Sequence, residues 1–123
     1  MAIPIDQGSE AFQWLDQHVV DALEAPDEAF DWVFMLKERD WPLLEAVWRE
    51  RPTEWREAYS YILCNGPVQE SQRILRLALF DNDPNVAAEA AATLLGHHAI
   101  DKNLPAFPLE VVERINQLRA KER

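Results

Sequence analysis

Apolar residues recur along this chain at the three- and four-residue spacing of amphipathic helices. In each such stretch the apolar positions fall on one side of a helical wheel, and polar residues occupy the other side. Prolines, glycines and capping residues separate the stretches from one another. No stretch alternates apolar and polar residues as a half-buried strand does. The pattern predicts an all-α chain of about seven helices joined by short turns.

The turn residues define helix pairs within a single domain, 1–123. Ser9 and Asp40 are expected to be N-caps, and Pro26 marks the turn between the first two helices. Gly66 and Gly96 are expected to end helices as C-terminal caps. The predicted helix pairs and the final capping helix cover residues 9–39, 41–65, 67–96 and 109–121.

Two of these pairs repeat the same pattern. When Pro52 is aligned with Pro84, apolar residues coincide on both sides of the turn. The coinciding residues are Leu43 with Leu75, Val47 with Leu79, Trp48 with Phe80, Trp55 with Ala87, Ala58 with Ala90, Tyr59 with Ala91, Ile62 with Leu94 and Leu63 with Leu95. A unit of two short helices buries little surface alone, so these repeats are expected to stack on one another.

The segment 77–96 contains a distinct motif: a leucine-rich first helix, an Asp-x-Asp-Pro-x-Val turn, and then small residues before Leu-Gly. The residues that carry the pattern are Asp81, Asp83, Pro84, Val86, Ala90, Ala91, Leu94, Leu95 and Gly96. This motif resembles the short HEAT-like repeat first recognised around phycobilin lyases. The family often has an arginine after the turn valine, which ties neighbouring turns together, whereas this chain has Ala87. The resemblance implies a right-handed stack of about three antiparallel helix pairs, a HEAT-like α-solenoid that binds macromolecules along its second helices.

The charge of the chain is negative and unevenly distributed. There are 22 acids and 12 bases, which give a net charge of −10. Residues 1–36 contain no Lys or Arg, whereas the balance from Phe107 onward is slightly positive. Such a charge disfavours direct binding to nucleic acid or to an anionic membrane, and it attracts a basic protein. The same acids would also keep a small domain soluble, so charge alone does not decide.

The sequence contains no recognisable catalytic constellation. It has no phosphate-binding glycine loop, no His-Glu-x-x-His motif and no Gly-x-Ser-x-Gly motif. His97 and His98 follow Gly96 and are expected to cap the last carbonyls of that helix. Asp81 and Asp83 are explained by turn chemistry rather than by a metal site. We expect no catalytic residue, no cofactor and no metal.

Cysteine content and the first residues indicate the compartment. Cys64 is the single cysteine, which excludes an internal disulfide and a cysteine-based zinc cluster, and a buried structural thiol is expected. The first residues lack the basic region and the long apolar run of a signal peptide, and no stretch is long enough for a membrane span. These features predict a cytoplasmic protein.

Two surfaces are candidates for binding a partner. One surrounds Trp14, which lies off the apolar side of its helix; it either anchors an interface or packs on a neighbouring helix. The other comprises the outward strips of the second helices, whose alignment across stacked repeats would produce a continuous acidic groove. The predicted partner-binding residues are Glu10, Trp14, Asp21, Asp27, Asp31, Glu38, Glu54, Glu57, Tyr61 and Glu89.

We therefore expect a non-catalytic scaffold that captures a basic protein through an acidic, tryptophan-containing surface. In size and composition the chain resembles small acidic bacterial immunity proteins, which implies neutralisation of a cognate toxin such as a nuclease. One alternative is a HEAT-like adaptor or assembly factor in a larger complex. Another is a cofactor-handling accessory protein or an enzyme, which would need an enclosed polar pocket.

Overall fold

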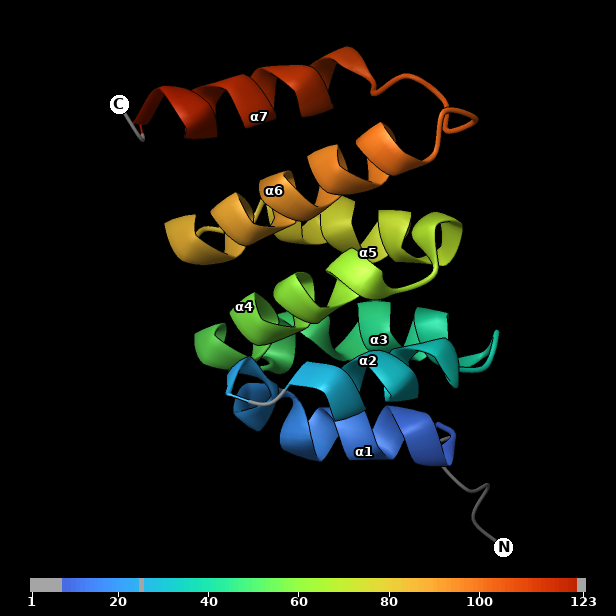
Figure 1. Ribbon diagram of the computed structural model, residues 1–123. Helices are drawn as coiled ribbons and strands as arrows, with labels where there is room; N and C mark the ends of the chain where they lie inside the picture. The colour runs from blue at the N-terminus through green and yellow to red at the C-terminus, as the bar shows by residue number, and fades with distance from the viewer. Residues whose placement is uncertain (1–7, 25, 122–123) are drawn as a thin grey trace, which may run out of the picture.

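The computed structural model describes residues 8–24 and 26–121, and these residues form helices joined by turns and one longer loop (Figure 1). The α-helices and short 3-10 segments are α1 (Glu10–His18), η1 (Val19–Leu23), α2 (Pro26–Phe34), α3 (Asp40–Val47), η2 (Trp48–Glu50), α4 (Thr53–Ile62), η3 (Leu63–Asn65), α5 (Val68–Leu79), α6 (Pro84–Ile100) and α7 (Leu109–Lys121). No strand occurs in this described part, so the prediction of an all-α chain is confirmed.

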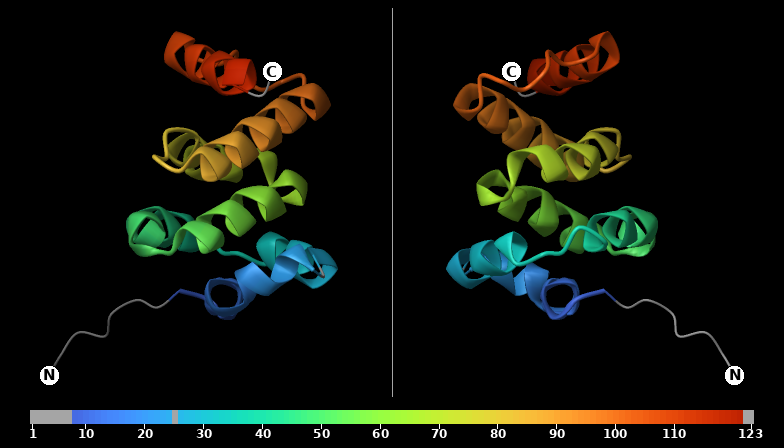
Figure 2. Two further views of the ribbon diagram at one scale, coloured as in Figure 1. Left: turned by 90° about the vertical axis from the view of Figure 1, so that its left-hand side faces the viewer. Right: turned by 90° about the vertical axis from the view of Figure 1, so that its right-hand side faces the viewer.

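The helices succeed one another from one end of the molecule to the other (Figure 1). α1 contacts α2 at the N-terminal end, and α7 lies at the opposite end against α5 and α6. The second helices of the three successive pairs are α2, α4 and α6, and α4 contacts both of the others. On the other side of the molecule, α5 contacts both α3 and α7 (Figure 2). Within residues 8–24 and 26–121, no helix combines the length and apolar character that a membrane crossing requires.

Ser9 caps α1 as predicted, because its Oγ accepts a hydrogen bond from the Phe12 backbone N–H at 3.2 Å. Asp40 has a different role from the predicted helix cap. Its fully buried carboxylate accepts hydrogen bonds from Ser9 N at 2.9 Å, Ser9 Oγ at 2.5 Å and Lys37 N at 2.6 Å. All three donors precede α3, so Asp40 fastens the start of α1 to the start of α3.

The core contains most of the residues that coincide in the sequence repeat. Trp48, Tyr59 and Leu94 are among the fully buried side chains. Four of the matched residues are exceptions: Leu43 and Val47 are half-buried, Phe80 is 51% exposed and Leu95 is 37% exposed. Phe80 directly follows the last residue of α5, so its side chain leaves the buried side of that helix.

α6 continues through Gly96 to Ile100, so the prediction that Gly96 ends this helix is wrong. His97 and His98 lie inside the helix and do not cap it. The buried His97 donates through Nε2 to the Leu63 carbonyl at 2.8 Å, and His98 Nε2 donates to the Pro105 carbonyl at 2.9 Å. These contacts offset the helix-propensity cost of about 1 kcal/mol for an internal glycine.

Arginines connect successive layers of helices. Arg56 on α4 pairs with Asp81 in the α5–α6 turn, with Nε and Oδ2 2.8 Å apart. Arg114 on α7 donates to the backbone carbonyls of Leu79 at 2.9 Å and Asp81 at 3.3 Å. Ala87, which follows the turn valine Val86, is fully buried and carries no side chain that could make such a connection.

Candidate functional site

The outer side of α2 presents carboxylates and aromatic rings together. Asp27, Phe30, Asp31 and Phe34 are spaced three or four residues apart, so they share one side of the helix. Asp27 and Asp31 are exposed, and Phe30 is half-buried. Phe34 is 63% exposed, an unusual position for a phenyl ring on a helix that also contributes to the core.

α4 continues this surface. The ring of Tyr61 lies beside that of Phe30, with centroids 6.4 Å apart and planes tilted by 43°. Glu54 and Glu57 precede Tyr61 at helical spacing; Glu54 is exposed and Glu57 is half-buried. Because Tyr61 contacts Phe30, the acidic sides of α2 and α4 adjoin one another.

Glu89 extends the negative charge onto α6. Burial, and after it the negative charge of Glu57, raises the pKa of Glu89. The carboxylates of Glu57 and Glu89 therefore interact although they belong to different helices. Burial, with a further contribution from Glu89, raises the pKa of the Cys64 thiol, which is half-buried.

We define the acidic face as the surface formed by these residues of α2, α4 and α6. Its members are Asp27, Phe30, Asp31, Phe34, Glu54, Glu57, Tyr61 and Glu89. Such an arrangement attracts cationic groups and offers apolar ring surface beside them.

The carboxylates of the acidic face are not neutralised by local cations. The ion pairs in the described part of the chain are Arg51–Asp16, Arg56–Asp81 and Arg73–Glu45. None of them includes a residue of the acidic face. Asp16 of α1, outside the acidic face, is compensated by Arg51, whose Nε lies 2.7 Å from its Oδ1.

Three other predicted carboxylates lie elsewhere on the surface. Glu10 is in the first turn of α1, Asp21 is in η1, and Glu38 precedes α3; all three are exposed. Within residues 8–24 and 26–121, no hydrogen bond, ion pair or ring contact joins them to the acidic face. The structure therefore brings together the acids of the second helices and leaves these three separate.

Trp14 packs on a neighbouring helix. Its indole stacks on that of Trp32 in α2, with centroids 5.5 Å apart and planes 18° from parallel. Trp14 also contacts His18 of its own helix, with ring centroids 4.8 Å apart. Of the two interpretations of Trp14, its half-buried, stacked position favours packing over a free interface anchor.

Two aromatic members of the acidic face are absent from the predicted partner-binding residues. Phe30 and Phe34 belong to a run in which apolar residues occupy most positions of α2. Successive helical residues are about 100° apart, so Phe34 cannot share the buried direction of Val33. The apolar residues of α2 cover more of the helix circumference than one buried side can hold. This excess was the sequence signal that some of these rings face outward.

Among the described residues, no group of three or more His, Cys, Asp or Glu side chains is arranged to hold a metal ion. No protein-family model, curated protein or solved structure matches this chain. The resemblance to HEAT-like repeats therefore rests on the residues of segment 77–96, and the candidate site rests on the geometry of the acidic face.

Proposed function

We propose that this chain is a HEAT-like helical scaffold that binds a basic protein at its acidic face and catalyses no reaction. The observation that carries this proposal is the set of unpaired carboxylates beside Phe30, Phe34 and Tyr61. Opposite charge accelerates the encounter with a cationic partner. Aromatic rings supply the apolar contact area that slows dissociation.

Two features support a right-handed stack of HEAT-like pairs as the scaffold. The second helices α2, α4 and α6 contact in order, which is the arrangement expected when helix pairs stack. In the turn that carries the resemblance, Asp83 Oδ1 accepts from Asn85 N at 2.9 Å and from Val86 N at 3.2 Å, with Pro84 in the first helical turn. This is the cap chemistry that the Asp-x-Asp-Pro pattern implies.

Within this class we favour a cytoplasmic inhibitor of the immunity type, which occludes the active site of a toxin such as a nuclease. A nuclease presents cationic side chains because its substrate is a phosphate backbone. The acidic face offers carboxylates in place of phosphates, with rings that contact the apolar rim of such a site. Binding therefore competes with substrate and needs no chemistry from the inhibitor.

The test is calorimetry with the product of the neighbouring gene, together with that protein's activity assay. The variant Asp27→Lys/Asp31→Lys should weaken binding by about a hundredfold, since two charges change sign at the interface. Its matched control is Glu110→Lys/Glu113→Lys, which makes the same charge change on two exposed residues of α7. Equal losses for the two variants, or an affinity that does not fall with added salt, would contradict the acidic face as the binding surface.

A second candidate is an adaptor or assembly factor within a larger complex. The observation that favours it is apolar surface far along the chain from α2: Leu95, Ile100, Leu109 and Val112 are 37%, 76%, 73% and 38% exposed. An adaptor uses more than one surface and leaves its partner active. Full partner activity in the presence of saturating scaffold would favour the adaptor over the inhibitor.

A further inference from the structure

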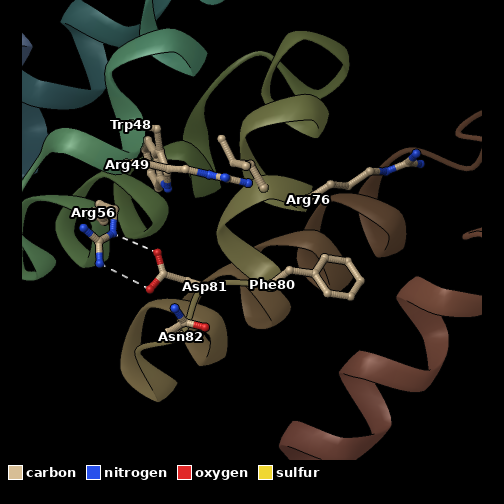
Figure 3. Close-up of a pocket in the computed structure, with 8 residues that line it drawn as sticks. Trp48, Arg49, Arg56, Arg76, Phe80, Asp81 and Asn82 are labelled. Carbon is tan, nitrogen blue, oxygen red and sulfur yellow. Dashed lines mark hydrogen bonds and ion pairs between the residues drawn. The ribbon is translucent and has the colours of Figure 1, made fainter.

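A cavity of about 600 Å³ lies between η2, α4 and the end of α5 (Figure 3). Its lining includes three arginines, Arg49, Arg56 and Arg76, and a single carboxylate, Asp81. No residue of the acidic face lines it. The chain as a whole has a net charge of −10, so a cavity lined by three arginines and one carboxylate has the opposite sign of charge. The binding of a basic protein at the acidic face gives no reason for this cluster of arginines.

The carboxylate of this cavity is already engaged. Asp81 Oδ2 accepts from Arg56 Nε at 2.8 Å, and Oδ1 accepts from Arg56 Nη2 at 3.3 Å and from Asp83 N at 2.9 Å. Arg49 is exposed, and within the described residues it has no hydrogen-bond or ion-pair partner. The charge of Arg49 is therefore available to a bound group.

The wall of the cavity also includes a buried donor that lacks an acceptor. Trp48 is 1% exposed, and its Nε1–H has no hydrogen-bond partner. The buried Nε–H of Arg76 lacks one as well, but the Arg76 guanidinium is directed away from Arg56 and Asp81 (Figure 3). The indole N–H donates and cannot accept, so only a group that brings an acceptor atom can satisfy it. A buried donor without a partner costs about 1–3 kcal/mol, so an acceptor at the Trp48 indole would be stabilising.

An apolar ring completes the wall. Figure 3 shows Arg56 joined to Asp81 on one side and the ring of Phe80 on the other, with the guanidinium of Arg76 directed away from that pair. Phe80 is 51% exposed, although it occupies the position that Trp48 fills in the preceding repeat. A flat apolar group placed on this ring covers it and leaves an attached anion near Arg49.

We propose that this cavity binds a small anion in which a phosphate or carboxylate group is attached to a flat ring. The guanidinium of Arg49 pairs with the oxyanion through its planar N–H fork. Trp48 Nε1 supplies a donor deeper in the wall, and Phe80 packs on the ring. This site is separate from the acidic face and does not depend on the proposed capture of a basic protein.

The experiment follows the tryptophan indole N–H signals of the full chain by ¹H–¹⁵N NMR, with the Trp48 signal assigned by triple-resonance methods. Phenyl phosphate titrated into the millimolar range should shift the Trp48 signal saturably. Arg49→Gln should raise the dissociation constant about tenfold, the effect of losing one charge-assisted hydrogen bond. Arg119→Gln is the matched control, because Arg119 is exposed on α7 and does not line the cavity. Circular dichroism would verify that both variants keep the helical fold.

Three further probes separate the parts of the proposal. Weaker binding of inorganic phosphate and of phenol than of phenyl phosphate supports joint recognition of anion and ring, and benzoate reports whether a carboxylate can replace the phosphate. Equal binding of inorganic phosphate overturns the role of Phe80, and equal binding of phenol overturns the role of Arg49. An unmoved Trp48 signal, or equal effects of Arg49→Gln and Arg119→Gln, overturns the site. Tighter binding of a single-stranded oligonucleotide at the same signals would assign the cavity to nucleic acid and overturn the small-molecule proposal.

Discussion

Arg56 on α4 and Asp81 in the α5–α6 turn form an ion pair whose side chains are only 16% and 9% exposed. Breaking one partner of such a pair leaves a charge with neither water nor a counter-ion. We expect Asp81→Asn to lower the free energy of unfolding by about 2 kcal/mol, measured by urea denaturation. The control is Glu45→Gln, which removes the Arg73–Glu45 pair, where the side chains are 76% and 37% exposed. That change should stay below about 0.5 kcal/mol; equal losses would contradict a structural role for the Arg56–Asp81 pair.

Two glycines should respond in opposite ways to substitution by alanine. Gly96 lies inside α6, and a Cβ there would have no heavy atom within 4 Å, so Gly96→Ala should stabilise the protein by about 0.5–1 kcal/mol. A Cβ at Gly66 would lie 2.8 Å from Val33 Cγ1, so Gly66→Ala should destabilise it by about 1–3 kcal/mol. Thermal unfolding of both variants measures the difference. Destabilisation by Gly96→Ala would mean that α6 ends at Gly96 after all.

Tyr59→Phe should leave stability unchanged or raise it by up to about 1 kcal/mol. The ring of Tyr59 packs against both Trp48 and Trp55, but its buried hydroxyl has no hydrogen-bond partner. Burial raises the pKa of this hydroxyl, so it remains neutral at all ordinary pH values. Removal of the oxygen keeps the packing and eliminates the cost of the unpartnered group. Chemical denaturation provides the measurement, and a loss above 1 kcal/mol would reveal a hydroxyl partner.

Glu89→Gln should change how stability depends on pH. The pKa of Glu89 is raised in the folded protein, so the folded state holds its proton more tightly than the unfolded chain. The stability contribution of Glu89 therefore falls as pH rises from the ordinary carboxyl pKa through the raised value. At neutral pH Glu89→Gln should be more stable than the parent protein, and below pH 4 the two should coincide.

Glu57→Gln provides the complementary measurement, because the charge of Glu57 is the second cause of the raised pKa of Glu89. This variant should retain part of the pH dependence, since burial of Glu89 remains. Unfolding free energies across the acid range would distinguish the two variants. A difference between Glu89→Gln and the parent that does not vary with pH would contradict the raised pKa.

Local sequence signals predicted the helices well. Apolar periodicity and turn residues indicated an all-α chain, and the hydroxyl of Ser9 caps α1 as expected. Local signals failed where a distant contact decides the outcome. α6 runs through Gly96 because His97 reaches the carbonyl of Leu63 in another layer. Asp40 binds the backbone of Ser9, which the spacing around Asp40 itself does not reveal.

The carboxylates of the candidate site could be predicted from the sequence, but not all of its aromatic residues could. Asp27, Glu57 and Glu89 were assigned to the outward strips of the second helices, and the interaction of Glu57 with Glu89 reflects how α4 meets α6. Of its aromatic members, Tyr61 was predicted, whereas Phe30 and Phe34 were missed because they follow the apolar pattern of α2. The pairing of Arg56 with Asp81 likewise depends on the register between layers, which one sequence does not specify.

The carboxylate of Asp40 holds together two points that are far apart in the chain, Ser9 and the residues just before α3. The segment between them, which includes α2 and its part of the acidic face, is thus a loop closed at its base. A loop held in this way has little freedom to lose when another molecule docks on it. The surface is preorganised, so a smaller share of the contact energy is spent on ordering the chain during association.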